Sequence, residues 1–267
     1  MKKVISISLT IATVIGIIIL MAFSANTHSN RTCPGVTIKI DYGQRKNASD
    51  ILLVYNDVRQ TLSLNFDSLK GKPISEIHIE KIEKAVKKMS YVKTVETYVE
   101  VNGEIQLRLT QRRPIARVYG TSGKSFYIDQ TGTIIPIRTF YPARVVIISG
   151  FIDDNFYTGE NIDIMASEND SLFANSPLRN LYQMAAKINN DDFLKNEITQ
   201  IVVNNDQTIN LIPLVGNHII EMFSFENYEE KLDKLKIFYK KGLRQSGWGK
   251  YKKINIEFKD QIVCTKI

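Results

Sequence analysis

The sequence predicts an α+β protein: a single N-terminal transmembrane helix, a small domain of order strand, helix, helix, strand, strand, then a mostly antiparallel β domain with flanking helices. Three observations predict it. Residues 4–23 are uncharged, hydrophobic residues over 35–119 follow strand and helix spacings in that order, and short alternating runs dominate 120–267. Residues 1–3 are expected to form a cytoplasmic tail and residues 24–34 a linker.

The apolar run Val4–Phe23 is long enough to cross a membrane. At 1.5 Å per residue its helix would measure about 30 Å, the thickness of a bilayer's hydrocarbon core. Lys2 and Lys3 precede it, and the next basic residue is Arg31. The positive-inside rule therefore places residues 1–3 in the cytoplasm and the rest of the chain outside it.

A cleaved signal peptide is the alternative for this run, because Ala22 and Ser24 are small enough for a cleavage site. Signal cores are usually shorter, about 7 to 15 residues, so an uncleaved anchor is favoured. Whether the anchor is cleaved stays open.

The small domain begins with an alternating strand at Val36–Ile40. A helix is expected from an N-cap at Ser49-Asp50 through Leu62, and a second helix over Ile77–Met89. Two strands follow, joined by Asn102-Gly103, the dipeptide most typical of a tight hairpin turn.

The β domain shows turn residues between alternating runs. Phe126–Ile128 and Thr133–Ile137 form a predicted hairpin, and a helix begins at a Ser176 cap. Further strands and a helix near Asn227 follow. The remaining predicted strands are Arg144–Ser149, Ile198–Val203, Thr208–Ile212, His218–Phe223, Lys253–Phe258 and Ile262–Cys264.

Composition argues against several classes of function. The net charge of +7 permits a polyanion site, but the helical lysines alternate with glutamates, which favours a solvated helix face. Cys33 and Cys264 have no metal-ligand spacing and the three histidines are scattered. A disulfide between the two cysteines is allowed outside the cytoplasm, although two separate core residues are favoured.

No motif predicts catalysis. The segment Gly120–Ser125 resembles a phosphate-binding loop, but the first glycine of that pattern is replaced by Val118, so we expect a plain loop. The acid pairs Asp153-Asp154 and Asp191-Asp192 are adjacent, which suits loop solvation and helix capping better than acid–base chemistry. We expect a protein without catalytic residues, metal or cofactor.

Several segments resemble a known family. The element order after the anchor resembles a POTRA domain, and the run Gln111–Val118 with Phe126–Asp129 resembles the bacterial cell-division protein family FtsQ, also called DivIB. The residues that carry the family motif are Arg113, Pro114, Ile115, Ala116, Arg117, Tyr127, Asp129 and Gly132. The resemblance covers nearly the whole chain from anchor to final strand.

The resemblance implies a scaffold of the division machinery in the inner membrane at the septum. Such proteins bind the single-pass proteins FtsB and FtsL outside the cytoplasm, chiefly near the last strands, and help recruit and regulate septal peptidoglycan synthesis. Nucleic acid and small-molecule substrates are not expected. The alternative is a POTRA-containing, chaperone-like envelope assembly protein, although too few residues remain here for a membrane barrel.

The last strand is the expected binding element. A terminal strand over Ile262–Ile267 leaves one backbone edge open, and such an edge accepts a partner's strand; an ordinary edge protected by Lys266 is the alternative. Arg112, Arg113 and Arg117 are expected to be solvated. The candidate partner-binding residues are Ile254, Ile256, Phe258, Ile262, Val263 and Cys264.

Overall fold

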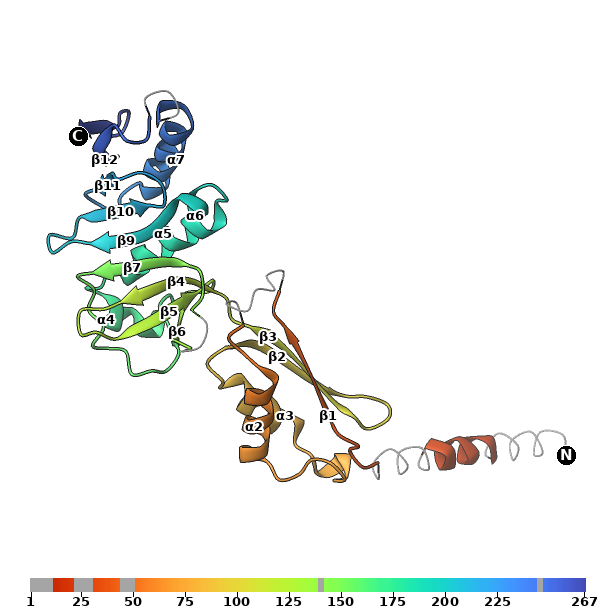
Figure 1. The fold of residues 1–267 in the computed structure, drawn as a ribbon. Coiled ribbons are helices and arrows are strands. Elements are labelled where there is room, and N and C mark those ends of the chain that lie inside the picture. The colour runs from red at the N-terminus through yellow and green to blue at the C-terminus, as the bar shows by residue number, and fades with distance from the viewer. Residues whose placement is uncertain (1–11, 22–30, 44–50, 139–141, 244–246) are drawn as a thin grey trace. The chain divides into compact units, whose positions relative to one another are not determined.

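The computed structural model describes residues 12–21, 31–43, 51–138, 142–243 and 247–267 (Figure 1). Internal contacts divide the chain into two units. Unit 1 comprises Met1–Gln44 and Leu53–Gln111, and unit 2 comprises Arg45–Leu52 and Arg112–Ile267.

The expected membrane span, Val4–Phe23, lies only partly within the described residues. Residues 12–21 are helical, whereas the two ends of the span and the tail at 1–3 lie outside the described ranges. Among the helices that the structure describes, none has the length and apolar character needed to cross a bilayer.

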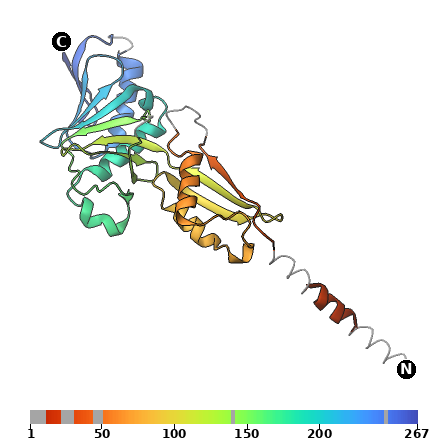
Figure 2. The same ribbon diagram turned by 60° about the horizontal axis from the view of Figure 1, so that its bottom comes forward.

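Unit 1 is a three-stranded sheet with two helices on one face (Figures 1 and 2). Strand β1 (Val36–Asp41) pairs in parallel with β3 (Ile105–Gln111), and β3 pairs antiparallel with β2 (Val92–Val99). The helices are α2 (Tyr55–Asn65) and α3 (Ile79–Lys87), with a short 3-10 turn at Ile74–Glu76. The predicted order of strand, two helices and two strands is confirmed.

Two boundaries in unit 1 differ from the prediction. Helix α2 begins at Tyr55, because the Leu53 amide donates to Gln111 Oε1 at 2.7 Å and keeps the chain extended before the helix. The Asp57 side chain accepts the Val54 amide at the helix start; the expected cap, Ser49-Asp50, lies outside the described residues. The expected linker also ends too late, because Cys33 is fully buried in the unit 1 core.

Unit 2 contains one ten-stranded sheet of order β13-β12-β11-β10-β9-β7-β4-β5-β6-β8. Its strands are β4 (Pro114–Tyr119), β5 (Ser125–Asp129), β6 (Thr133–Pro136), β7 (Val146–Gly150), β8 (Ile162–Asp163), β9 (Ile198–Val203), β10 (Ile209–Pro213), β11 (Ile219–Met222), β12 (Tyr251–Asn255) and β13 (Val263–Lys266). The parallel pairs are β4–β7, β7–β9 and β11–β12, and the others are antiparallel. The mostly antiparallel character is confirmed.

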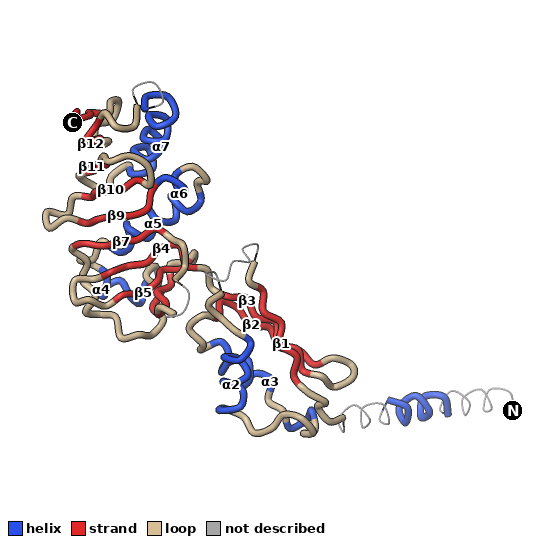
Figure 3. Tube along the Cα trace, viewed as in Figure 1, coloured by secondary structure: helices blue, strands red, loops and turns tan. Residues whose placement is uncertain are grey.

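Helices pack against this sheet and cover its core (Figure 3). They are α4 (Asp170–Phe173), α5 (Leu178–Asn190), α6 (Leu194–Glu197) and α7 (Tyr228–Phe238), with a 3-10 turn at Ser167–Asn169 and a π-helical turn at Tyr239–Leu243. The Leu178 amide donates to Ser176 Oγ at 3.3 Å, close to the expected cap. Helix α5 buries the side chains Leu181, Met184 and Ile188, which recur at helical spacing.

The boundary between the units falls between Gln111 and Arg112, ahead of the expected boundary at Tyr119. Strand β4 pairs with β5 and β7 of unit 2, so its residues contribute to the larger sheet. The expected boundary followed the turn at Gly120, which joins β4 to β5 inside unit 2.

Candidate functional site

Strand β13 forms one end of the unit 2 sheet. Among the described residues it pairs only with β12, antiparallel, with Asn255 opposite Val263 and Ile254 opposite Cys264. Alternate residues of a strand point their backbone groups to opposite sides, so about two of its four residues point away from β12. Those N–H and C=O groups form an open edge.

The register identifies which residue faces outward. The Ile256 amide donates to the Glu221 carbonyl of β11 at 3.0 Å. A trans peptide points its N–H and C=O in opposite directions, so the Asn255 carbonyl faces β13. In the antiparallel register Asn255 lies opposite Val263, and its carbonyl therefore accepts the Val263 amide. Val263 therefore points its N–H toward β12, and the next residue, Cys264, points its N–H toward the open edge.

Exposed apolar side chains surround this edge. Val263 on β13 is 45% exposed, the terminal Ile267 is 80% exposed, and Phe258 in the segment between β12 and β13 is 44% exposed; Phe223, which follows β11 one strand further in, is 52% exposed. Ile262 and Cys264 are half-buried and pack against the core. The edge therefore joins backbone donors and acceptors with an apolar rim.

Two of the candidate partner-binding residues do not fit that role. Ile254 and Ile256 are fully buried in the unit 2 core, so a partner cannot touch their side chains. Ile254 lies on the face of β12 that the helices cover, and Ile256, two residues further along, points to the same face. Both side chains therefore point into the core. They support the edge from beneath.

A buried ion pair fixes the segment between β12 and β13. Lys231 of α7, 7% exposed at its side chain, donates to Glu257 Oε2 at 2.8 Å and to the Ser224 carbonyl at 3.1 Å. The Phe223 amide donates to the same carboxylate at 2.8 Å. Burial alone would raise the pKa of Glu257, but the hydrogen bonds from Lys231 and Phe223 lower that pKa below its ordinary value.

The edge is also basic. Residues 250–267 contain five lysines against two acidic residues, and only Lys253 among the five forms an ion pair in the described structure, with Glu221 at 2.6 Å. Lys250, Lys252 and Lys266 are exposed. This charge favours a partner segment that carries acidic side chains.

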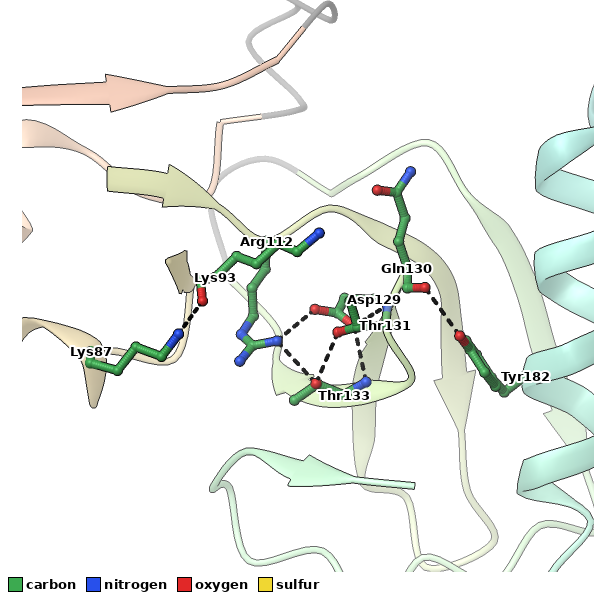
Figure 4. Close-up of polar contacts among 8 residues, drawn as sticks. All are labelled: Lys87, Lys93, Arg112, Asp129, Gln130, Thr131, Thr133 and Tyr182. Carbon is green, nitrogen blue, oxygen red and sulfur yellow. Dashed lines mark hydrogen bonds and ion pairs between the residues drawn. The ribbon is translucent and has the colours of Figure 1, made fainter. Parts of the chain in front are cut away.

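One family motif residue, Asp129, is the centre of a separate, buried network at the start of unit 2 (Figure 4). Asp129, 1% exposed at its side chain, ends β5 and accepts four hydrogen bonds. Its Oδ1 accepts the Thr131 amide and hydroxyl, both at 2.8 Å, and the Thr133 amide at 2.9 Å. Its Oδ2 accepts Arg112 Nη1 at 2.8 Å, and Arg112 also donates to Thr133 Oγ1 at 3.0 Å.

The neighbouring turn is tied to helix α5. The Tyr182 hydroxyl donates to the Gln130 carbonyl at 3.0 Å, and burial together with the Asp129 and Asp163 charges raises the pKa of Tyr182 (Figure 4). Gly132 adopts φ +82°, and an added Cβ would lie 3.1 Å from the Met165 side chain and 3.3 Å from Tyr182. The turn therefore requires glycine here.

The other motif residues also serve the fold. Ile115 and Ala116 lie in the core, and the Arg113 carbonyl accepts the Gln130 amide at 3.0 Å. The Arg117 guanidinium lies 4.7 Å from the Tyr119 ring centroid. The Tyr127 hydroxyl accepts the Ala143 amide at 3.0 Å. Together with Pro114, the first residue of β4, the motif builds the first hairpin of unit 2.

Two sequence expectations about charged residues are wrong. Arg112 is not solvated: its side chain is 15% exposed and pairs with Asp129. Asp154 is fully buried and accepts the Ser122 amide, the Ser122 hydroxyl and the Lys124 amide at 2.9, 2.7 and 3.0 Å. It thus organises the loop Gly120–Ser125 from inside. The Asp-x-Thr spacing at Asp129 is a local sequence signal for its turn. No local spacing indicates the contact of Asp154 with the loop.

The remaining chemical expectations concern acids and thiols. Asp191 caps α6 as expected, accepting the Phe193 and Leu194 amides at 2.9 and 3.0 Å. Cys33 and Cys264 are both free thiols, the first in the unit 1 core and the second on β13. Within the described ranges, no group of three His, Cys, Asp or Glu side chains could hold a metal ion.

Comparisons with known protein families match both units. Residues 113–265 match the family model described as FtsQ/DivIB, C-terminal related, which spans more than half of the chain. Residues 31–110 match a POTRA-like domain. No curated protein matches the sequence. The chain belongs to the FtsQ/DivIB family of cell-division proteins and carries a POTRA-like domain ahead of the family's C-terminal related domain.

Proposed function

We propose that this protein is a non-catalytic, membrane-anchored scaffold of the division machinery that binds FtsB-like and FtsL-like single-pass proteins by strand addition at β13. The open edge of β13 carries the proposal, because it presents backbone groups that a partner strand can pair. The family match supports a division-associated scaffold role, and both matched domains are of non-catalytic kinds.

The shape of the edge specifies what a partner strand must offer. Pairing with the outward groups around Cys264 needs an extended segment, and the exposed Phe223, Phe258 and Val263 favour apolar residues on one face of it. The lysines along β12 and β13 favour acidic residues beside them. The Lys231–Glu257 pair holds this surface in place before binding, which lowers the ordering cost of association.

The N-terminal segment supports the proposed location. Residues 4–23 carry no charge, and Ile17, Ile18 and Leu20 within the described helical residues are 53% to 70% exposed. Exposed apolar side chains of this kind are stable in lipid. We place the N-terminus in the cytoplasm and both units outside it, at the division septum of the inner membrane. Partners in the same membrane plane then meet the edge at high effective concentration.

A binding experiment with backbone-directed variants tests this function. The full chain is purified in detergent micelles, and its affinity for FtsB-like and FtsL-like proteins of the same cell is measured by fluorescence anisotropy. Cys264→Pro removes the outward N–H and should weaken binding about tenfold or more, because it deletes one pairing donor and crowds the edge. Cys264→Ser keeps the N–H and should bind within twofold of wild type.

Two further outcomes make the test decisive. Val263→Pro removes a donor that faces β12, so it should release β13 and lower both binding and stability, unlike Cys264→Pro. Equal affinity of Cys264→Pro and wild type would reject strand addition at this edge. No complex at high micromolar concentration would reject the proposed partners, and normal division of cells depleted of the protein would reject the cellular role.

A further inference from the structure

Helices α2 and α3 of unit 1 border a groove that the proposed function does not use. The groove has a volume of about 520 Å³, within the range of ligand-binding sites. Its floor is apolar and half-buried, formed by Phe66, Ala85 and Met89. Three exposed lysines line it as well: Lys81 and Lys84 of α3, and Lys88, the residue that follows the helix.

The three lysines form one narrow stripe along α3. Positions i, i+3 and i+7 lie within about 60° of one another on a helix with 100° per residue. Glu80 and Glu83 do not line the groove, although Glu80 is four residues before Lys84 and therefore lies beside the stripe. None of the three lysine side chains forms an ion pair or hydrogen bond with a described residue.

This arrangement does not serve the fold of unit 1. Like charges at i, i+3 and i, i+4 destabilise a helix slightly, and among the described residues none of the three lysines makes a close ion pair, although the Glu80 charge one turn before Lys84 offsets part of the repulsion. The groove floor keeps apolar side chains half-exposed beside it. A ligand that has carboxylates next to an apolar face would satisfy both features at once.

We propose that this groove binds an acidic amphipathic α-helix of a partner protein. Lys81 to Lys88 spans about 10 Å, or two helical turns, which matches carboxylates at i, i+4 and i+7 of a helix lying along α3. Leucine or alanine beside those carboxylates reaches Ala85 and Met89. A flat anionic membrane fits less well, because it would also face Glu80, which lies beside the stripe on the same helix.

A designed peptide tests the proposal. The probe is a fluorescein-labelled 16-residue helix with Glu at i, i+4 and i+7 beside a leucine stripe, and its binding to the full chain in detergent micelles is measured by anisotropy against protein-free micelles. We expect saturable binding to wild type. Lys84→Glu with Lys88→Glu should weaken it about tenfold or more, since two attractions become repulsions.

Matched variants separate the groove from overall charge. Lys70→Glu with Lys87→Glu makes the same change in net charge and also reverses one lysine near the end of α3. Lys87 donates to the Lys93 carbonyl and lies outside the groove (Figure 4). This pair should bind the peptide within twofold of wild type. Lys84→Gln with Lys88→Gln, which adds no repulsion, should still weaken binding, and circular dichroism checks that all variants remain folded.

Three results would overturn the proposal. The first is equal weakening by the groove pair and the control pair, which would indicate a general charge effect. The second is no binding above the protein-free background. The third is binding of the chain to vesicles with anionic phosphatidylglycerol through Lys84 and Lys88 without peptide binding, which would assign the groove to lipid. The outcome is independent of β13, because none of these variants alters unit 2.

Discussion

Replacing Asp129 with alanine should destabilise unit 2 strongly. The change removes the acceptor of four hydrogen bonds and leaves Arg112, 15% exposed, without its partner. Breaking a buried ion pair from one side costs about 3 to 5 kcal/mol, and the buried Thr133 amide loses its acceptor as well. Thr131 and part of Arg112 remain accessible to water, so we expect about 3 to 4 kcal/mol.

Urea unfolding monitored by tryptophan fluorescence measures this effect in the full chain. Trp248 is the one tryptophan of the sequence and packs against the unit 2 core, so its signal reports unit 2. With a urea slope of about 2 kcal/mol per molar, Asp129→Ala should lower the midpoint by about 1.5 to 2 M. Asp153→Ala, the same change at an exposed carboxylate, should lower it by less than about 0.3 M. Equal midpoints for the two variants would refute the role of the Asp129 network.

Three further predictions concern unit 2. Burial alone would raise the pKa of Asp154, but hydrogen bonds from Ser122 and Lys124 lower this pKa, so the carboxylate stabilises unit 2 fully at neutral pH and loses this effect below about pH 4. Asp154→Asn should therefore make the urea midpoint depend less on pH in acid, and an unchanged pH dependence would contradict this role. Burial lowers the pKa of His218, so below about pH 6.5 the unfolded chain binds a proton that the folded chain does not, and the stability should fall as the pH drops. His218→Phe should remove this fall when urea midpoints are measured over the same pH range. Gly150→Ala should separate β7 from β9 and lower the thermal midpoint, because φ is +103° and the new Cβ would lie 2.0 Å from the Val203 carbonyl oxygen; a wild-type melting curve would show that this contact relaxes.

Local patterns predicted most of the elements, because strand and helix periodicities in this chain reflect burial on one face. The hairpin at Asn102-Gly103 and the strand Ile198–Val203 follow directly from such patterns. The start of α2 did not, since a hydrogen bond from Leu53 to Gln111 holds the chain extended across a long sequence separation. The domain boundary was misplaced because β4 finds its partners, β5 and β7, further along the chain.

The sequence predicted the last strand that carries the candidate site, whereas the contacts that support this strand were not predicted. A final strand is visible in the sequence, and its place at the end of the sheet agrees with the expected open edge. The pairs Lys231–Glu257 and Arg112–Asp129 join residues far apart in sequence, so no local spacing reveals them. The alternation of Ile254 and Ile256 placed both on one face, but only the packing of α7 and its neighbours shows that this face is the core.

Hydrogen exchange of the full chain with and without its FtsB-like partner tests strand addition most directly. The Cys264 amide faces the open edge, so we expect it to exchange quickly in the free protein and to become protected in the complex, while the Val263 amide, paired with β12, changes little. Protection that appears elsewhere in unit 2 while Cys264 continues to exchange at its free rate would contradict binding at β13.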